Sequence, residues 1–132
     1  MIDRTAIVAE ALMTASTLYT EVGDRVWSPI APAKGFDGTQ SSIVFHQSDA
    51  SSHPTGATNS ATFEFKCYGD NNTYTKARTV FRLLYDRLQQ LTETMSSGSI
   101  IMATLDNDFQ LEPEPETNHK AHLASFTILF TG

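Results

Sequence analysis

The sequence predicts an α+β fold, a two-layer sandwich with two helices packed on one face of a mostly antiparallel sheet of about four strands. Three observations lead to this fold class. Residues 61–68 alternate apolar and polar side chains, which is the period of a half-buried strand. Residues 77–91 repeat apolar side chains at the spacing of an amphipathic helix. Because the predicted elements run helix, short strand, hairpin, helix and hairpin, both helices must cover the same sheet.

Length and charge limit the possible functions. A chain of 132 residues is predicted to form a single domain, 1–132, with one hydrophobic core. No apolar run reaches the roughly 18 residues that a transmembrane helix needs, so we expect no membrane contact. The formal net charge is −6 and Lys and Arg do not cluster, which argues against specific binding of DNA or RNA. The single cysteine, Cys67, forms no internal disulfide and fits a reducing cytoplasm.

Residues 3–20 form the first predicted helix, with Asp3 as its N-cap. One broad face of this helix is apolar and is expected to pack on the core. A second group of apolar side chains gathers on the opposite face: Ile7, Ala11 and Leu18. A helix that is apolar on two sides needs two partners, so we predict that these three residues belong to a subunit interface. The alternative is that they are isolated surface hydrophobes, which are common.

The next segments are a short strand at residues 25–27, a loop, and a strand at residues 42–47. The loop, residues 28–41, holds two prolines and two glycines and is interpreted as an insertion. Its Gly-Phe-Asp-Gly sequence lacks the flanking strand and helix of a phosphate-binding loop. Residues 48–60 are small and polar, and they predict a second insertion, either a solvent-facing hairpin arm or a mobile loop.

The strand at residues 61–68 is expected to pair antiparallel with the strand at 42–47. Its core-facing side chains are Phe63, Phe65 and Cys67. Residues 69–72, Gly-Asp-Asn-Asn, then interrupt the alternation. These residue types favour turns and helix caps, so the segment is interpreted as a corner that turns the chain into a helix capped by Asn72 or Thr73.

The second helix and the last hairpin complete the predicted fold. The apolar stripe of this helix consists of Ala77, Phe81, Leu84, Leu88 and Leu91, widened by Tyr74, Val80 and Tyr85. Leu83 lies off the stripe, on the side expected to face water. Residues 92–98 end the helix, and residues 99–111 and 120–131 form two strands. The Glu-Pro-Glu-Pro-Glu sequence between them predicts an exposed turn.

The histidines and the aspartate pair do not predict a metal site. His119 and His122 are three residues apart on a predicted strand and therefore point to opposite faces. His46 and His53 lie in other segments, and no metal-binding motif is present. The pair formed by Asp106 and Asp108 lacks the glycine and the closing glutamate of a calcium loop.

Nucleophilic chemistry is not predicted either. Cys67 belongs to the apolar side of its strand, so we expect a buried and inert thiol. Nothing in the sequence positions a pair of catalytic carboxylates. We therefore expect no enzyme activity and no cofactor.

Three segments share the order of features found in one known protein family. The stretch LYTEVGDRVW joins a helix end to a glycine, a basic residue and a short strand. FEFKCYGDNNTYTKARTVFRLLYDRLQQL joins an alternating strand, a turn and an alanine-bearing helix, through Phe63, Phe65, Cys67, Tyr68, Gly69, Ala77, Leu84 and Leu88. IIMATLDNDFQLEPEPETNHKAHLASFTILFTG fits a C-terminal hairpin. In these features the chain resembles the tail completion, or tail terminator, proteins of long-tailed bacteriophages.

This resemblance implies a structural role in a virion and not an enzymatic one. Such proteins form a ring, usually a homohexamer, on the head-facing end of the tail tube. The ring ends tube polymerisation and presents a docking surface to the head connector. The implied partners are further copies of the chain, the major tail tube protein and the head-completion or connector protein. DNA would pass through the lumen without specific binding, and the protein would be found in the tail and neck after assembly in the host cytoplasm.

A head-to-tail ring uses two different patches on each subunit. The helix face with Ile7, Ala11 and Leu18 is predicted to supply one patch, and Leu83 or a sheet edge the other. The polar arm is expected to become ordered on contact with a partner. The arm residues expected to touch that partner are Ser51, His53, Thr55 and Thr58.

Three other functions remain compatible with the sequence. The first is another neck component of the same assembly, such as a head-completion or connector protein. The second is a small α+β enzyme, which would have a deep pocket with converging polar groups. The third is a monomeric binding module that recognises its partner through the polar arm.

Overall fold

The computed structural model describes residues 3–14, 16–31, 40–52, 58–96, 98–115 and 117–131. Its helices are α1 (Arg4–Leu12), α2 (Thr17–Val22) and α3 (Tyr74–Leu88), with one short 3-10 turn, η1 (Asp70–Asn72). Its strands are β1 (Val26–Trp27), β2 (Ser42–Ser52), β3 (Thr58–Tyr68), β4 (Glu93–Met95), β5 (Gly98–Gln110) and β6 (Ala121–Thr131). All these strands belong to one sheet in the order β1-β2-β3-β6-β5-β4.

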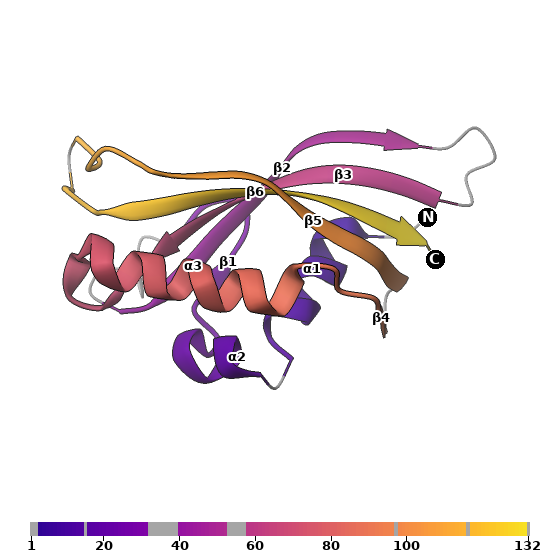
Figure 1. The fold of residues 1–132 in the computed structure, drawn as a ribbon, viewed down its shortest axis with the longest axis horizontal. Coiled ribbons are helices and arrows are strands. Elements are labelled where there is room, and N and C mark those ends of the chain that lie inside the picture. The colour runs from indigo at the N-terminus through magenta and orange to yellow at the C-terminus, as the bar shows by residue number, and fades with distance from the viewer. Residues whose placement is uncertain are drawn as a thin grey trace.

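The predicted α+β class is confirmed in outline, and its details differ. The helices lie on one side of the sheet (Figure 1). The described part of the chain has six strands instead of about four, because β1 adds a parallel strand to β2 and β4 adds an edge strand to β5. All the other strand pairs are antiparallel. Strand β4 lies within the segment that was expected only to end a helix.

The prediction of one continuous helix over residues 3–20 is wrong. Asp3 does cap α1, since its Oδ1 accepts a hydrogen bond from the Ala6 N–H (3.0 Å), but α1 ends at Leu12. Helix α2 then begins with a cap of its own, the Ser16 Oγ, which accepts from the Tyr19 N–H (3.2 Å). Ser and Thr side chains compete for backbone groups in this way, and they interrupt helices that apolar periodicity alone would continue.

Burial overturns the expectation of a second exposed apolar face. Ile7, Ala11 and Leu18 are all buried and belong to the same core as the sheet. Ile7 and Ala11 lie on α1, which contacts β1, β4 and β5, and they are buried together with Val8 and Leu12 of the same helix. Leu18 lies on the separate helix α2, which packs on α3. All three are buried within one subunit, so they offer no surface to a second copy.

Phenylalanine side chains from the middle of the sheet form the centre of the core. Phe45, Phe63, Phe65 and Phe126 are at most 1% exposed, and their rings lie within contact of one another. Cys67 is buried beside them, as the alternation predicts. Helix α3 covers this cluster with its own buried face, Ala77, Val80, Leu84 and Leu88. The apolar stripe of α3 is therefore confirmed as its core side.

The polar arm begins as an extension of the β2–β3 hairpin. Strand β2 continues to Ser52 past a bulge between Gln47 and Asp49, and β3 starts at Thr58. Of the predicted contact residues, Ser51 pairs with Ser60 in the backbone ladder and Thr58 pairs with Thr131. His53 and Thr55 lie outside the described residues, as does most of the loop at 28–41.

The Gly-Asp-Asn-Asn segment is a structural corner that holds three elements together. The Asp70 Oδ1 accepts from the Ser41 N–H at the start of β2 (2.9 Å). Asn72 bridges to the segment before β6, because its Oδ1 accepts from the Lys120 N–H (2.7 Å) and its Nδ2 donates to the Asn118 carbonyl (2.9 Å). Thr73 caps α3. The side chains of Asp70, Asn72 and Thr73 thus form hydrogen bonds within the fold.

Candidate interaction surfaces

Each described histidine pairs with its own carboxylate, and the pairs lie apart. His46 Nε2 is 3.1 Å from a Glu64 oxygen, and His122 Nε2 is 2.7 Å from a carboxylate oxygen of Asp108. His119 lies 3.9 Å from Glu114. Within the described ranges, no three His, Cys, Asp or Glu side chains come together as a metal site would require.

The pKa of the Cys67 thiol and the pKa of the Tyr68 hydroxyl are both raised. Burial raises the pKa of the Cys67 thiol far above its ordinary value. Burial also raises the pKa of Tyr68, and the neighbouring Glu114 raises it further by its charge and by accepting the Tyr68 hydroxyl hydrogen bond (3.1 Å). A thiol that stays protonated is a poor nucleophile, so this arrangement favours a packing role for Cys67.

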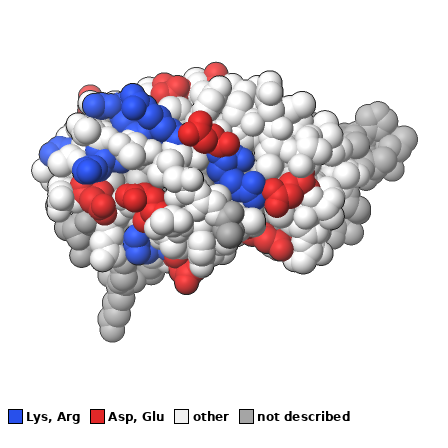
Figure 2. Space-filling model, turned by 60° about the horizontal axis from the view of Figure 1, so that its bottom comes forward, with Lys and Arg blue, Asp and Glu red and all other residues white. Residues whose placement is uncertain are grey.

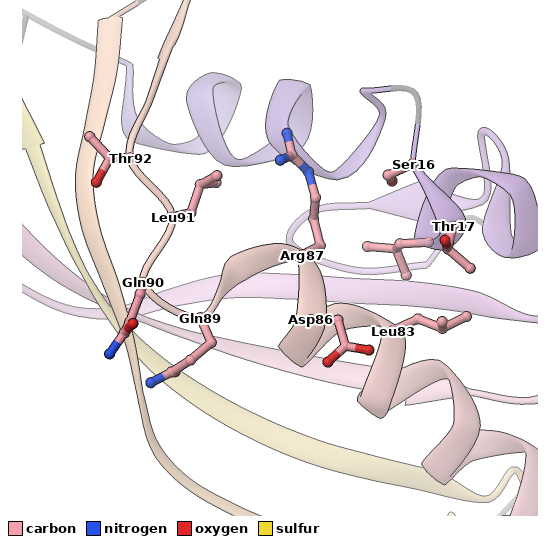
Figure 3. Close-up of a pocket in the computed structure, with 10 residues that line it drawn as sticks. Ser16, Thr17, Leu83, Asp86, Arg87, Gln89, Gln90, Leu91 and Thr92 are labelled. Carbon is pink, nitrogen blue, oxygen red and sulfur yellow. The ribbon is translucent and has the colours of Figure 1, made fainter.

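A groove with a volume of about 490 Å³ lies between α2 and the end of α3. Leu83 lines it and is half-buried against the core, so this residue is less exposed than the sequence suggests. Figure 3 shows Leu83 and Asp86 on α3, with Thr17 of α2 nearby and Gln90 in the segment after the helix. The walls are thus part apolar and part polar, and Asp86 and Arg87 are the charged residues among those that line the groove.

Arg87, at the back of this groove, connects three elements. Its Nε donates to the Ala11 carbonyl at the end of α1 (2.9 Å), and its Nη1 pairs with the Glu93 carboxylate of β4 (2.9 Å). The Ala11 carbonyl is one of the last four of α1, which have no partner within the helix. Two nitrogens of the guanidinium are therefore bound within the fold, and the third, Nη2, is buried without a hydrogen-bond partner among the described residues.

A smaller hollow of about 190 Å³ lies on the sheet face opposite the helices. Pro29, Ile30 and Ala31, which follow β1, form one wall, and Val44 and His46 of β2 form another. Lys66, Tyr68 and Glu114 complete the lining. Ile30, on the rim of the hollow, is 76% exposed.

The two edges of the sheet are closed to different extents. The segment after α3 closes the first half of β5 through three hydrogen bonds: Gln90 N–H to the Ala103 carbonyl, Thr92 hydroxyl to the Ile101 carbonyl, and Leu105 N–H to Gln89 Oε1. Residues 106–110 of β5 lie beyond this cover. On the other edge, β1 pairs only with Ile43 and Val44 of β2. No described residue forms a backbone hydrogen bond to the outer edge of residues 45–48.

Surface charge does not single out a nucleic-acid site. On the face shown in Figure 2, Lys and Arg side chains alternate with Asp and Glu, and no continuous basic patch is seen there. This distribution agrees with the net charge of −6. Among the described helices, none is long and apolar enough to cross a membrane.

The similarity that this chain shows to known proteins is one of structure. No family model matches the sequence, and no curated protein does. A chain in a solved structure described as the virion of a native gene transfer agent (GTA) particle superposes with a TM-score of 0.70 over 95% of this chain and 92% of that chain. The two sequences are 18% identical. This similarity establishes a shared fold across nearly the whole length.

Sequence reasoning missed which strand edges are free, and it missed the hollow beside β2. Which strands end a sheet depends on pairings distant in sequence, so the open edges of β2 and β5 could not be read from local patterns. One signal in the sequence was available. Asp106 and Asp108 lie inside a predicted strand, and charged side chains on an edge strand discourage its pairing with another chain.

Proposed function

We propose that this chain is a structural virion protein that forms a ring at the head-proximal end of a phage tail tube. There it ends tube polymerisation and joins the tail to the head connector. The observation that carries the proposal is the fold similarity to a chain of a virion particle over 95% of this chain. The tail terminator resemblance of the sequence supplies the finer role and the expected homohexamer.

The sheet supports assembly by head-to-tail contacts. Its two open edges differ in sequence and position, and different patches on one subunit generate rings when the rotation closes. The half-buried Leu83 in the groove beside α2 is a candidate contact for the tube or the connector. The β2–β3 hairpin extends the sheet to one end (Figure 1), and its polar tip is proposed to touch the same partners.

DNA is proposed to cross the lumen of this ring without specific binding. The chain has 15 acidic and 9 basic residues, so a closed ring carries a large negative charge. Negative walls repel phosphates and keep the passage from holding DNA. Replacing lumen-facing carboxylates by lysine should therefore slow DNA release, and unchanged release would count against this part of the proposal.

The test is to remove the chain from the particle whose genome encodes it and to image the products. We expect tail tubes of irregular, excessive length that do not join heads, and restoration of both defects by the wild-type chain. Tubes of normal length that fail to join heads would instead assign the chain to another neck position. A map of the intact particle that places the chain away from the tube end would refute the proposal.

A further inference from the structure

A second groove, the β5 groove, has a volume of about 330 Å³ and lies between α3 and the free half of β5. Its apolar lining consists of Phe81, Tyr85 and Leu105, and its charged lining of Arg82, Asp86 and Asp108. The volume falls at the lower end of ligand pockets, which measure about 300–1,000 Å³. A groove beside an open strand edge offers an added strand a pocket for its alternate side chains.

The strand edge along the β5 groove is free. The Leu111 N–H donates to the Ala121 carbonyl (3.1 Å), so the backbone groups of Leu111 face β6. Alternation then directs the backbone groups of Gln110 and Asp108 away from the sheet. Among the described residues, none forms a backbone hydrogen bond to these outward groups. The segment after α3 occupies the edge only up to Leu105, so the rest of β5 is open to an added strand.

Charge at this edge selects a basic partner. Residues 98–119 contain no lysine or arginine, and their acidic residues are Asp106, Asp108, Glu112, Glu114 and Glu116. His122 Nε2 lies 2.7 Å from Asp108 Oδ2, and the Asp108 side chain is still 36% exposed. Among the described residues that line the groove, Arg82 is the only cation against two carboxylates. The edge therefore attracts Lys and Arg side chains and repels phosphates.

We propose that an extended segment of a second virion protein adds to residues 106–110 of β5 and places a lysine or arginine side chain in the β5 groove. The added strand runs antiparallel to β5, as β4 does further along the same edge. Residues directly opposite each other in a sheet point to the same face. Asp108 lies opposite Ala124 of the core and therefore faces α3. The residue paired with Asp108 thus enters the groove.

The groove suits both ends of such a side chain. Its methylene groups pack on the rings of Phe81 and Tyr85, whose centroids are 6.4 Å apart. Its charge then meets Asp86 of α3 and Asp108 of β5. The next residue of the segment points to the other face of the sheet, beside Phe109, which is 47% exposed. We therefore expect the segment to alternate basic and apolar residues.

A second copy of this chain does not supply the segment. With a formal net charge of −6, another copy would bring more negative charge to an acidic edge. Lys and Arg alternate with an apolar residue only at residues 76–78, which lie within α3. The inference rests on the proposed function, in which a neighbouring virion protein supplies the segment. It leaves β4, the terminal strand, and the edge of β2 to contacts between copies.

A blocked hexapeptide in which arginine and valine alternate is the probe. Isothermal titration calorimetry, with peptide up to the millimolar range, should show saturable binding to the wild-type chain. Binding should weaken at high salt, because salt screens the ionic contacts. The control is a peptide with glutamate in place of arginine, which should not bind. Equal binding of the two peptides, or no binding of the arginine peptide, would overturn the inference.

Methylation of the peptide backbone separates strand addition from simple charge attraction. In an antiparallel strand, the residues paired with Asp108 and Gln110 direct their N–H groups to β5, and the residues between them direct theirs away. Because arginine enters the groove, N-methylation of the arginines should abolish binding. N-methylation of the valines should change the dissociation constant by less than about threefold. Equal losses, or the reverse pattern, would contradict the proposed pairing.

A charge reversal in the protein tests the groove itself. Asp86 is exposed on α3, so Asp86→Lys should keep the unfolding midpoint and raise the dissociation constant of the arginine peptide about tenfold or more. Asp24→Lys is the matched control, since Asp24 is exposed, lies outside the groove and changes the net charge equally. Equal effects of the two variants would show attraction by the whole acidic chain and refute a specific groove.

The outcomes separate this inference from the proposed function. A chain found at the tube end that does not bind the arginine peptide would overturn the groove inference and leave the tail role standing. A chain that binds the peptide with the expected methylation pattern, but whose removal leaves tails unchanged, would support the groove and refute the tail role. Self-association of the wild-type chain that Asp86→Lys abolishes would assign the groove to a second copy and overturn the inference.

Discussion

Gly69 is buried at the end of β3, directly against the first turn of α3. A Cβ at this position would overlap the backbone of Lys76 and Ala77. Backbone atoms of a packed helix cannot move aside as a flexible side chain would. The absence of a side chain at residue 69 therefore sets how closely strand and helix approach each other at the corner.

Substituting Gly69 should destabilise the fold strongly. We expect Gly69→Ala to lower the free energy of unfolding by about 1–3 kcal/mol or more, because the new methyl group overpacks the corner. Arg78→Ala, an exposed change one residue beyond Ala77, is the control and should stay within about 0.5 kcal/mol. Urea denaturation measures both, and a Gly69→Ala protein as stable as wild type would show that the corner can relax.

The buried thiol gives a second prediction at this scale. Because burial raises the pKa of Cys67, the native protein should contain almost no thiolate at pH 8 and should not react with a thiol-specific reagent. Unfolding in urea should expose one reactive thiol per chain. An Arg78→Cys variant, with its exposed position on α3, should react at once with one thiol, and rapid reaction of wild type would contradict the buried placement.

At the scale of elements, α1, the end of α3 and β4 depend on one another through polar side chains. Arg87 binds the end of α1 and the Glu93 carboxylate. Glu10 of α1 accepts hydrogen bonds from the Ser96 N–H and hydroxyl after β4. The contact between Arg87 and Ala11 spans 76 residues of sequence and the contact between Glu10 and Ser96 spans 86, so no local pattern could have predicted these two. They explain why the segment after α3 forms an edge strand instead of a loose turn.

Removing the Arg87 charge should destabilise the contact between α1, the end of α3 and β4. Arg87→Met keeps much of the side-chain volume and leaves the Ala11 carbonyl and Glu93 without their donor. We expect a loss of about 2 kcal/mol in the free energy of unfolding, the usual size for a hydrogen bond to a charged group. Arg82→Met, on the exposed side of the same helix, should change stability little. Similar losses for both variants would mean that Arg87 contributes only through its methylene groups.

For the whole molecule, the burial of Ile7, Ala11 and Leu18 changes how assembly is expected to proceed. These side chains complete the core of one subunit, so the chain does not need a second copy in order to hide them. In the proposed ring, association would therefore join subunits that are already folded.

This view predicts that folding is independent of protein concentration. The urea midpoint should stay constant when the chain is diluted over a hundredfold range, because the unfolding reaction involves one chain. A midpoint that rises with concentration would indicate an obligate oligomer and would return the apolar face of α1 to the interface. Circular dichroism at each concentration provides the measurement.

The sequence by itself determined the α+β class, the β2–β3 hairpin, the core side of α3 and the burial of Phe63, Phe65 and Cys67. Each of these follows from apolar side chains that recur at every second residue of a strand or at every third and fourth residue of a helix. Tertiary structure alone decided where Ile7, Ala11 and Leu18 go, because the other elements cover the whole apolar side of α1 and Leu18 lies on a separate helix that packs on α3. Tertiary structure also decided which strand edges stay open. The order of strands in the sheet depends on pairing between segments that are distant in sequence, and a local sequence pattern does not show which segments pair.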